Sequence, residues 1–402
     1  PTCLGEPATI VGTRGNDVLR ASSDDVVVGL GGNDVIYAHR LSDELCGSGG
    51  NDWIRGTHSG GEQIAGGSGS DTIYGLGQMD SLHGGRGDDL LIGDPRGDVP
   101  RLYARDELYG GRGDDRMYGF GHADLLYGGA GNDILGGGRH YDVLRPGPGD
   151  DFIRAGGGRD VVLYGDSLQP VSVDLTLGRA TGEGTDSFEG VEGVSGSRFD
   201  DDLVGSAGPD MLIGDAGADS LAGLDGEDVM LPDLTAHASG GVGYVDDVSD
   251  DVVDGGGGTD SITFYRWPPA PLTIDLLAGR ATGEGSDTLV SIEDVFAIAF
   301  ADVWVRGTDD ANLIATFSGG DDYVEALGGD DRVLTGGGMD EVDGGDGIDE
   351  CVSAEIARNC ESEGPVSKVR LTPELPEQWR ALLRYFSIGT PTRLPYSVHE
   401  PS

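Results

Sequence analysis

The fold is decided by residues 110–163, which read GGRGDDRMYGFGHADLLYGGAGNDILGGGRHYDVLRPGPGDDFIRAGGGRDVVL. This stretch divides into six nonapeptides, and each carries an aspartate at its sixth position: Asp115, Asp124, Asp133, Asp142, Asp151 and Asp160. The form is G-G-x-G-x-D-x-U-x, where U is apolar, and it recurs upstream at residues 66–74 and 84–92. Glycine and aspartate favour a tight turn, and the last three residues favour a short strand with one inward side chain. Repetition of this unit predicts an all-β chain.

The nine-residue period also predicts how the strands stack. One nonapeptide makes half a turn, so two of them close a turn of eighteen residues. Successive turns then form two parallel sheets face to face, which is a parallel β-roll solenoid. At about 4.8 Å per turn, the block from residue 12 to residue 163 is roughly 40 Å long. Aspartates eighteen residues apart therefore lie at the same edge of the roll.

The middle of the chain contains a longer repeat. The segment VSVDLTLGRATGEG at residues 171–184 recurs as LTIDLLAGRATGEG at residues 272–285. Each copy reads as a strand followed by a glycine-rich turn. We interpret the copies as strand inserts that interrupt the roll and restart it, with boundaries of separate domains as the alternative. The expected parts are 1–163, a first β-roll block with an N-terminal cap; 164–263 and 264–361, each a strand insert with a further repeat block; and 362–402, a tail.

The C-terminal tail changes character. Residues 362–402 lose the nine-residue grid and contain the only lysine, Lys368. Apolar residues within Pro373–Ser387 follow a helical spacing, which predicts one short amphipathic helix. The last rung of a roll exposes apolar side chains, so we expect the tail to cap it, with partner binding as the alternative.

The charge balance limits the classes of function. The 402 residues include 72 Asp plus Glu against 26 Lys plus Arg, which gives a formal net charge of −46. Such a chain repels nucleic acid and anionic membranes. No stretch approaches the roughly 20 apolar residues of a membrane span. Acidic disorder is the alternative, but the regular grid favours divalent cations at the aspartates, so folding is expected to depend on metal.

The chain has four cysteines, an even number, which favours an oxidising, extracellular setting. Cys351 and Cys360 lie nine residues apart at U positions of successive rungs, so a disulfide between them is geometrically plausible. Cys3 and Cys46 are then the remaining pair. Buried free thiols are the alternative.

Up to about residue 361 the chain resembles the RTX, or hemolysin-type calcium-binding repeat, family on these nonapeptides. In that family calcium sits in the turns between same-side rungs, held by glycine-loop carbonyls and aspartates. Ligation by oxygen alone, without a Cys/His cluster, favours calcium over zinc or copper. The Arg-rich, Lys-poor usage also resembles exported proteins of high-GC Gram-positive bacteria. The resemblance implies multiple Ca²⁺ as cofactor, with ligands at the aspartates preceded by glycine two positions earlier: Asp17, Asp34, Asp52, Asp71, Asp89, Asp115, Asp133, Asp151, Asp160, Asp210, Asp219, Asp228, Asp260, Asp322, Asp331, Asp340 and Asp349.

The first block departs from the family pattern in an ordered way. Glycine-rich loops alternate with side-chain-rich loops, such as GLGQMD before Ser81 and GFGHAD before Leu125. Because alternate rungs turn at opposite edges, we predict calcium near Asp34 to Asp133 along one edge and little or none beside Asp80, Asp106 and Asp124. Bulky residues at these loops are expected to restrict the backbone that turns carbonyls toward a cation. The calcium-poor edge then serves partner contact, with degeneration without purpose as the alternative.

Enzyme signatures are missing, because neither H-E-x-x-H nor G-x-S-x-G occurs. We therefore expect no catalytic role. The sequence favours a secreted, extracellular calcium-binding repeat protein with a structural, cell-surface or matrix role that folds on binding calcium. The alternative is the repeat portion of a larger secreted hydrolase or toxin whose catalytic domain is absent from this chain. Self-association or a cell-surface partner is expected through the calcium-poor edge or the C-terminal tail.

Overall fold

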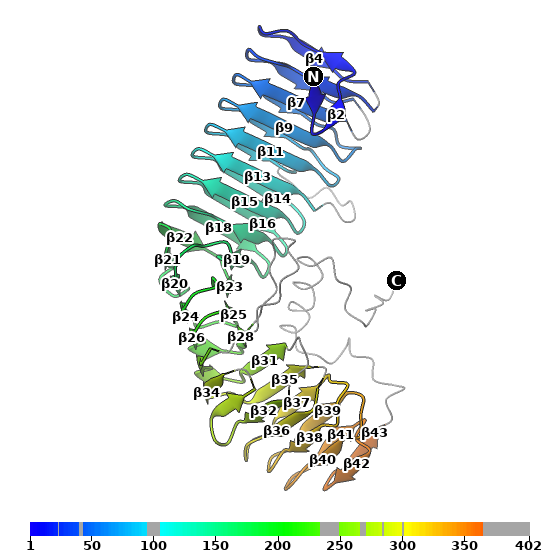
Figure 1. Cartoon of the computed structure of the whole chain (residues 1–402), viewed down its shortest axis with the longest axis vertical. Helices are drawn as coiled ribbons and strands as arrows, with labels where there is room; N and C mark the ends of the chain where they lie inside the picture. Colours follow the sequence, from blue (N-terminus) through cyan, green and yellow to red (C-terminus); the bar gives the residue numbers. More distant parts are fainter. Residues whose placement is uncertain are drawn as a thin grey trace. The chain divides into compact units, whose positions relative to one another are not determined.

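The computed structural model of the chain (Figure 1) describes residues 1–22, 24–39, 43–94, 105–233, 249–265, 271–283, 285–299 and 301–364. These residues form β-strands joined by turns and bends, without an α-helix. The expected all-β class with long parallel sheets is therefore confirmed. The helix expected within Pro373–Ser387, and with it most of the expected cap, lies outside the described residues. Two compact units are distinguished: residues 1–167 with 177–193, and residues 168–176 with 194–402.

Unit 1 is a stack of short strands in two parallel sheets, called sheet I and sheet II here. Strands of sheet I pair in the order β4 (Val18–Arg20), β6 (Val35–Tyr37), β8 (Trp53–Arg55), β10 (Thr72–Tyr74), β12 (Leu90–Ile92), β14 (Arg116–Phe120), β16 (Ile134–Arg139), β18 (Phe152–Gly157) and β22 (Thr185–Glu189). Strands of sheet II pair in the order β3 (Ile10–Val11), β5 (Val26–Val28), β7 (Glu44–Gly49), β9 (Gln63–Ser68), β11 (Ser81–Arg86), β13 (Glu107–Arg112), β15 (Leu125–Ala130), β17 (Val143–Arg145) and β19 (Val161–Leu163). The chain crosses from one sheet to the other in each half-turn, which is the β-roll.

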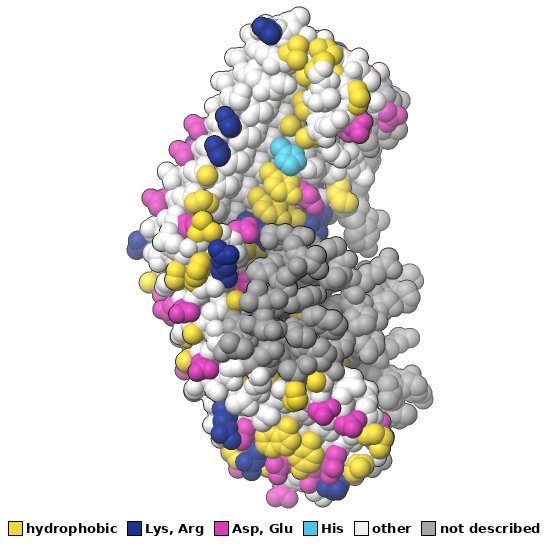
Figure 2. Space-filling view, viewed as in Figure 1, with side chains coloured by type: hydrophobic (Ala, Val, Ile, Leu, Met, Phe, Trp, Pro, Cys, Tyr) yellow, Lys and Arg dark blue, Asp and Glu magenta, His cyan; other side chains and the backbone are white. Residues whose placement is uncertain are grey.

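The U residue of each rung fills the space between the sheets. In sheet I, Ile54, Ile73 and Leu91 lie in register on neighbouring strands, and all three are fully buried. In sheet II, Leu82, Leu108 and Leu126 do the same. Each strand thus contributes one apolar side chain to a narrow core, so stability depends on continuous stacking. Much of the visible surface is white in Figure 2, since backbone and small residues cover a large part of it.

Unit 2 contains the same two kinds of sheet. Strands of its sheet I pair in the order β20 (Ser172–Asp174), β24 (Asp202–Val204), β26 (Ser220–Ala222), β29 (Val252–Asp254), β34 (Ser286–Val290), β33 (Arg280–Thr282), β32 (Leu272–Asp275), β36 (Val303–Arg306), β38 (Tyr323–Glu325), β40 (Glu341–Asp343) and β42 (Ile356–Arg358). Strands of its sheet II pair in the order β25 (Met211–Asp215), β28 (Val229–Asp233), β31 (Ser261–Tyr265), β35 (Asp294–Ile298), β37 (Leu313–Thr316), β39 (Arg332–Thr335), β41 (Glu350–Val352) and β43 (Ser362–Gly364). A short parallel pair joins β27 (Asp225–Gly226) to β30 (Gly257–Gly258), and β23 spans Gly193–Ser195.

The inserts form strands, as their alternating pattern predicts. In unit 2, β33 is antiparallel to both β32 and β34, while β34 pairs parallel with β29. In sheet II, β31 pairs directly with β35. The second insert therefore adds two strands to sheet I without breaking sheet II. In unit 1, β21 (Arg179–Thr181) of the first insert is likewise antiparallel to β22.

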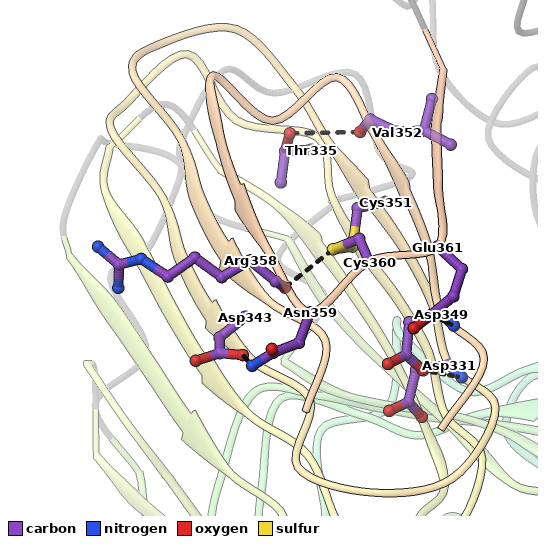
Figure 3. The surroundings of a disulfide bond; sticks show 10 residues. All are labelled: Asp331, Thr335, Asp343, Asp349, Cys351, Val352, Arg358, Asn359, Cys360 and Glu361. Carbon is purple, nitrogen blue, oxygen red and sulfur yellow. Dashed lines mark hydrogen bonds between the residues drawn. A yellow bond between two sulfur atoms is a disulfide. The ribbon is translucent and has the colours of Figure 1, made fainter. Parts of the chain in front are cut away.

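Both predicted disulfides are present. Cys3 and Cys46 have Cα atoms 5.6 Å apart, and the bond attaches the hairpin of β1 (Thr2–Cys3) and β2 (Glu6–Pro7) to the outer side of β7. Cys351 and Cys360 have Cα atoms 5.9 Å apart beside the last rungs (Figure 3). Each bond holds together rungs near one end of the array, where stacked repeats have fewest neighbours.

Candidate calcium sites

The aspartates of the glycine-rich loops of unit 1 form a column along one edge. The backbone N–H of each of the first six aspartates donates to Oδ1 of the aspartate one turn further on, at 2.7–2.8 Å. Every one of these residues is buried, with at most 2% of its surface exposed. We call this set the first-edge column: Asp34, Asp52, Asp71, Asp89, Asp115, Asp133 and Asp151.

The second carboxylate oxygen of each first-edge aspartate has no hydrogen-bond partner in the described structure. Oδ2 is buried and unbonded in all seven residues. Burying a carboxylate oxygen without a partner costs several kcal/mol, so a native protein rarely leaves seven in a row. A row of buried anionic oxygens, each beside backbone carbonyls, is a donor set for a hard cation such as Ca²⁺. The residues present therefore fit calcium.

Glycine at the start of six of the seven first-edge loops makes room for this oxygen, and Pro146 starts the loop before Asp151. A Cβ at Gly66 would lie 2.2 Å from Asp71 Oδ2, and one at Gly47 would lie 2.1 Å from Asp52 Oδ2. In the first-edge loops the fourth position favours glycine for its conformation, since Gly69 has φ of 122°. The glycines of the repeat thus keep the carboxylate oxygen accessible to an ion.

Burial changes the protonation of the first-edge column. Desolvation raises the pKa of Asp52, Asp71 and Asp133 to about 6. It raises the pKa of Asp115 to about 7 and that of Asp151 to about 8, with neighbouring carboxylates adding to the shift. At neutral pH the protonated form is therefore appreciable at Asp115 and Asp151, and a bound cation would favour the ionised form throughout the column.

The opposite edge holds a second column of buried carboxyl groups. Its members repeat the N–H to Oδ1 bonding of the first edge at 2.8–2.9 Å, and all except Asp43 have a buried, unbonded second oxygen. Burial raises the pKa of Asp142 to about 9 and that of Asp124 well above its usual value. We call this set the second-edge column: Asp43, Glu62, Asp80, Asp106, Asp124, Asp142 and Asp160.

We predicted one-sided calcium because bulky residues would restrict the backbone of the second-edge loops, and this reason is wrong. We expected bulky residues to restrict the second-edge loops, yet Gln78, His122 and His140 take φ of 75–76° at the position that glycine holds in the other loops. The turn therefore keeps its shape. Both edges are equally buried by surface exposure, but desolvation raises the pKa of Asp80, Asp106 and Asp142 to about 10, about 8 and about 9, which favours protonated carboxyl groups at these second-edge positions. One-sided calcium itself stays a prediction.

All seventeen predicted ligand residues are described, and most belong to such columns. In unit 2, the backbone N–H of Asp331 donates to Asp349 Oδ1 at 2.9 Å, and the backbone N–H of Asp349 donates to Glu361 Oε2 at 2.6 Å (Figure 3). A second chain runs from Asp322 through Asp340 to Glu355. Further chains link Asp210, Asp228 and Asp260, and Asp219 with Asp251.

Three of the seventeen differ from the rest. Asp17 Oδ2 accepts hydrogen bonds from the N–H and hydroxyl of Thr13, and Asp210 Oδ2 accepts one from the N–H of Ser206. Asp322 accepts from the hydroxyl of Ser318 at 2.7–2.8 Å. Here protein groups satisfy the oxygen that is unbonded in the first-edge column. Thr or Ser at the second loop position is the sequence signal for this difference.

The sequence analysis missed two aspartates in the inserts. Asp186 follows GEGT and Asp287 follows GEGS, so both match G-x-G-x-D. The backbone N–H of Asp151 donates to Asp186 Oδ1 at 3.0 Å, and this bond extends the first-edge column through β22. Asp186 Oδ2 accepts from the buried Tyr164 hydroxyl at 2.8 Å, beside a cavity of about 70 Å³. The irregular spacing hid these rungs, although the motif itself was visible.

Asp287 belongs to a compact carboxylate group in unit 2. Carboxylate oxygens of Asp233, Asp251 and Asp287 all lie within 4.8 Å of one another, and the last two residues are buried. Asp233 occupies the second loop position, where the repeat has glycine. Because Asp287 lies in the second insert, this group of carboxylates continues past the regular nonapeptides of unit 2.

Comparison with known families agrees with this geometry. The RTX calcium-binding nonapeptide repeat matches residues 8–36, 21–54, 56–91, 103–135, 137–166, 195–230, 247–264 and 318–351, together more than half of the chain. The chain belongs to this family, whose repeats bind multiple Ca²⁺ ions and are typically structural parts of secreted proteins. No curated protein matches the chain. Among the described residues, no helix has the length and apolar character of a membrane span.

Proposed function

We propose that this chain is a secreted calcium-binding β-roll protein with a structural, cell-surface or matrix role, and that calcium binding drives its folding. The observation that carries the proposal is the first-edge column, in which seven buried Oδ2 atoms lack a protein partner. Extracellular calcium supplies the missing charge, whereas low calcium leaves the carboxylates to repel one another. The two disulfides support an extracellular location.

We assign the calcium ligands to the seventeen loop aspartates and add Asp186 and Asp287. The four expected parts, 1–163, 164–263, 264–361 and 362–402, remain our proposed organisation of the chain. A non-catalytic role is supported by the repetitive loops. These loops place carboxylates in regular columns, whereas acid–base catalysis uses a single pair of carboxylates in two different environments.

Folding is tested by far-ultraviolet circular dichroism of the full chain under excess chelator, followed by added calcium. We expect loss of the β signal and its return with calcium, since the net charge of −46 is concentrated at the turns. Magnesium at equal concentration serves as the control, because it prefers a smaller, octahedral site. A chelator-treated chain with unchanged signal and unchanged stability, shown by elemental analysis to be calcium-free, would contradict the proposal.

A further inference from the structure

The outer face of sheet I in unit 1 differs in charge from the rest of the chain. The first and third residues of strands β4 to β18 point outward, and each is exposed or half-buried. None of them is acidic, although 72 of the 402 residues are Asp or Glu. We call this set the arginine face: Val18, Arg20, Val35, Tyr37, Trp53, Arg55, Thr72, Tyr74, Leu90, Ile92, Arg116, Tyr118, Ile134, Gly136, Phe152 and Arg154.

Three arginines of this face have no ion pair in the described part of the chain. Arg20, Arg55 and Arg116 are exposed and meet no carboxylate, whereas Arg154 pairs with Glu189 at 3.0 Å where the face ends. In unit 2 the arginine at the equivalent strand position is neutralised, as in Arg306–Glu325 at 3.3 Å. The positive charge of the arginine face is therefore left for a partner.

Aromatic side chains lie between these charges. The rings of Tyr37 and Trp53 have centroids 5.4 Å apart, and those of Trp53 and Tyr74 lie 5.8 Å apart. The guanidinium of Arg20 lies 4.2 Å from the centre of the Tyr37 ring. The rings hold one another upright on three successive strands, so the face is preorganised and loses little entropy on binding.

Two of the arginines lie at matching positions of the stack. Arg20 and Arg55 are the third residues of β4 and β8, two strands apart, which is roughly 10 Å along the roll axis at about 4.8 Å per strand. Arg116 is the first residue of β14 and Arg154 the third residue of β18, so these two are also two strands apart but are offset by two residues along the strand direction. Two pyranose units of a sugar chain have a similar length, so a polymer with a carboxylate on every second sugar matches this interval.

We propose that the arginine face binds an acidic polysaccharide that runs along the roll axis. Guanidinium groups recognise carboxylates bidentately, and the aromatic and aliphatic side chains between them pack against the apolar faces of sugar rings. A linear polymer meets every strand of a regular stack in the same way, which favours it over a globular acidic protein. The partner's negative charge complements this carboxylate-free face of an otherwise acidic chain.

The test uses the calcium-loaded full chain and hyaluronan oligosaccharides, which carry glucuronate on alternate sugars, with titration by calorimetry. We expect binding that weakens with added salt, because the contacts are partly ionic. The double substitution Arg55→Gln with Arg116→Gln is expected to weaken binding at least tenfold. The control Arg86→Gln with Arg112→Gln makes the same change in net charge at exposed loop positions of sheet II and is expected to leave affinity unchanged.

Circular dichroism in calcium verifies that both double variants are folded. Absence of hyaluronan binding to the wild-type chain, or an equal loss in the control variant, overturns the proposal. Poly-L-glutamate of matched charge provides the second arm. Tighter binding of this polymer, with the same dependence on Arg55 and Arg116, would assign the face to an acidic polypeptide and refute the polysaccharide.

Discussion

The two edges of unit 1 are predicted to respond differently to loss of one carboxylate. Asp133 and Asp142 lie nine residues apart on opposite edges, and each accepts a backbone N–H through Oδ1 and has an unbonded Oδ2. Asparagine preserves the Oδ1 bond and removes the charge. The pair Asp133→Asn and Asp142→Asn therefore isolates the charge at each edge.

The pKa values set the expected size of each effect. Burial raises the pKa of Asp133 from 3.8 to about 6, and that of Asp142 from 3.8 to about 9. At about 1.4 kcal/mol per unit, ionising Asp142 inside the protein costs about 7 kcal/mol. The corresponding cost for Asp133 is smaller, below about 3 kcal/mol once solvent screening is allowed for. At pH 7.5 we thus expect Asp142 to be a neutral acid and Asp133 a carboxylate available to calcium.

At pH 7.5, Asp133→Asn is expected to raise the calcium midpoint of folding about tenfold, equivalent to about 1.4 kcal/mol, because a charged ligand is lost. Asp142→Asn removes no calcium ligand on this reasoning, and asparagine need not take up a proton on folding, so its midpoint is expected not to rise. The measurement is circular dichroism during calcium titration in a metal-buffered solution. An equal increase for both variants would show that the second edge binds calcium as the first does, and would refute the reasoning.

The pH dependence provides an independent check on the same pair. A carboxyl group with a raised pKa stabilises the fold below its unfolded pKa of about 4, and this contribution is lost as pH rises through the folded value. In saturating calcium, raising the pH from 7.5 to 10 is therefore expected to destabilise the wild type by ionising Asp142. Asp142→Asn is expected to lose less stability over this range, as measured by denaturant unfolding. Equal losses in both proteins would show that Asp142 is already ionised at pH 7.5.

Two further predictions concern the ends and the loops of the array. Cys46→Ser and Cys360→Ser open loops with sequence separations of 43 and 9, so chain entropy predicts losses of about 4 and about 3 kcal/mol in denaturant unfolding with calcium; a loss below about 0.5 kcal/mol in either would mean that the rungs hold that end without the bond. Gly69→Ala is expected to destabilise by more than about 2 kcal/mol, because φ is 122° and the new Cβ would lie 2.0 Å from the carbonyl oxygen of Gly50. Gly157→Ala is the matched control, with nothing within 4 Å of the new Cβ, and similar losses for both would remove the steric argument.

The regular part of the fold could be predicted because its physics is local. Each nonapeptide specifies its own turn and its own inward side chain, so Leu108 and Leu126 meet in register once eighteen residues close a turn. Interruptions matter less than the spacing suggests. The backbone N–H of Asp80 donates to Asp106 Oδ1 across 26 residues at 2.9 Å, as other rungs do across eighteen.

The rest depended on contacts that spacing does not encode. The hydroxyl of Tyr164 reaches Asp186 across 22 residues, and neither residue belongs to a regular nonapeptide of the grid. The left-handed conformation of His122 and His140 could not be read from residue types alone, because a positive φ is uncommon outside glycine even though histidine takes it more often than most residues. The stacking of neighbouring turns holds these histidines at a positive φ, which glycine adopts without such support.

The hydrogen-bond pattern also explains why calcium binding and folding should be one process. Each first-edge carboxylate uses Oδ1 to hold the backbone of the preceding turn, as when Asp115 Oδ1 accepts from the N–H of Asp89 at 2.7 Å. The same group leaves Oδ2 for a cation, so ion and backbone are held by one side chain. When a turn loses its calcium ion, the uncompensated charge of a buried carboxylate remains beside the hydrogen bond that joins this turn to its neighbour. Neighbouring turns are therefore coupled through every carboxylate, and a chain built in this way should gain or lose calcium along the column cooperatively.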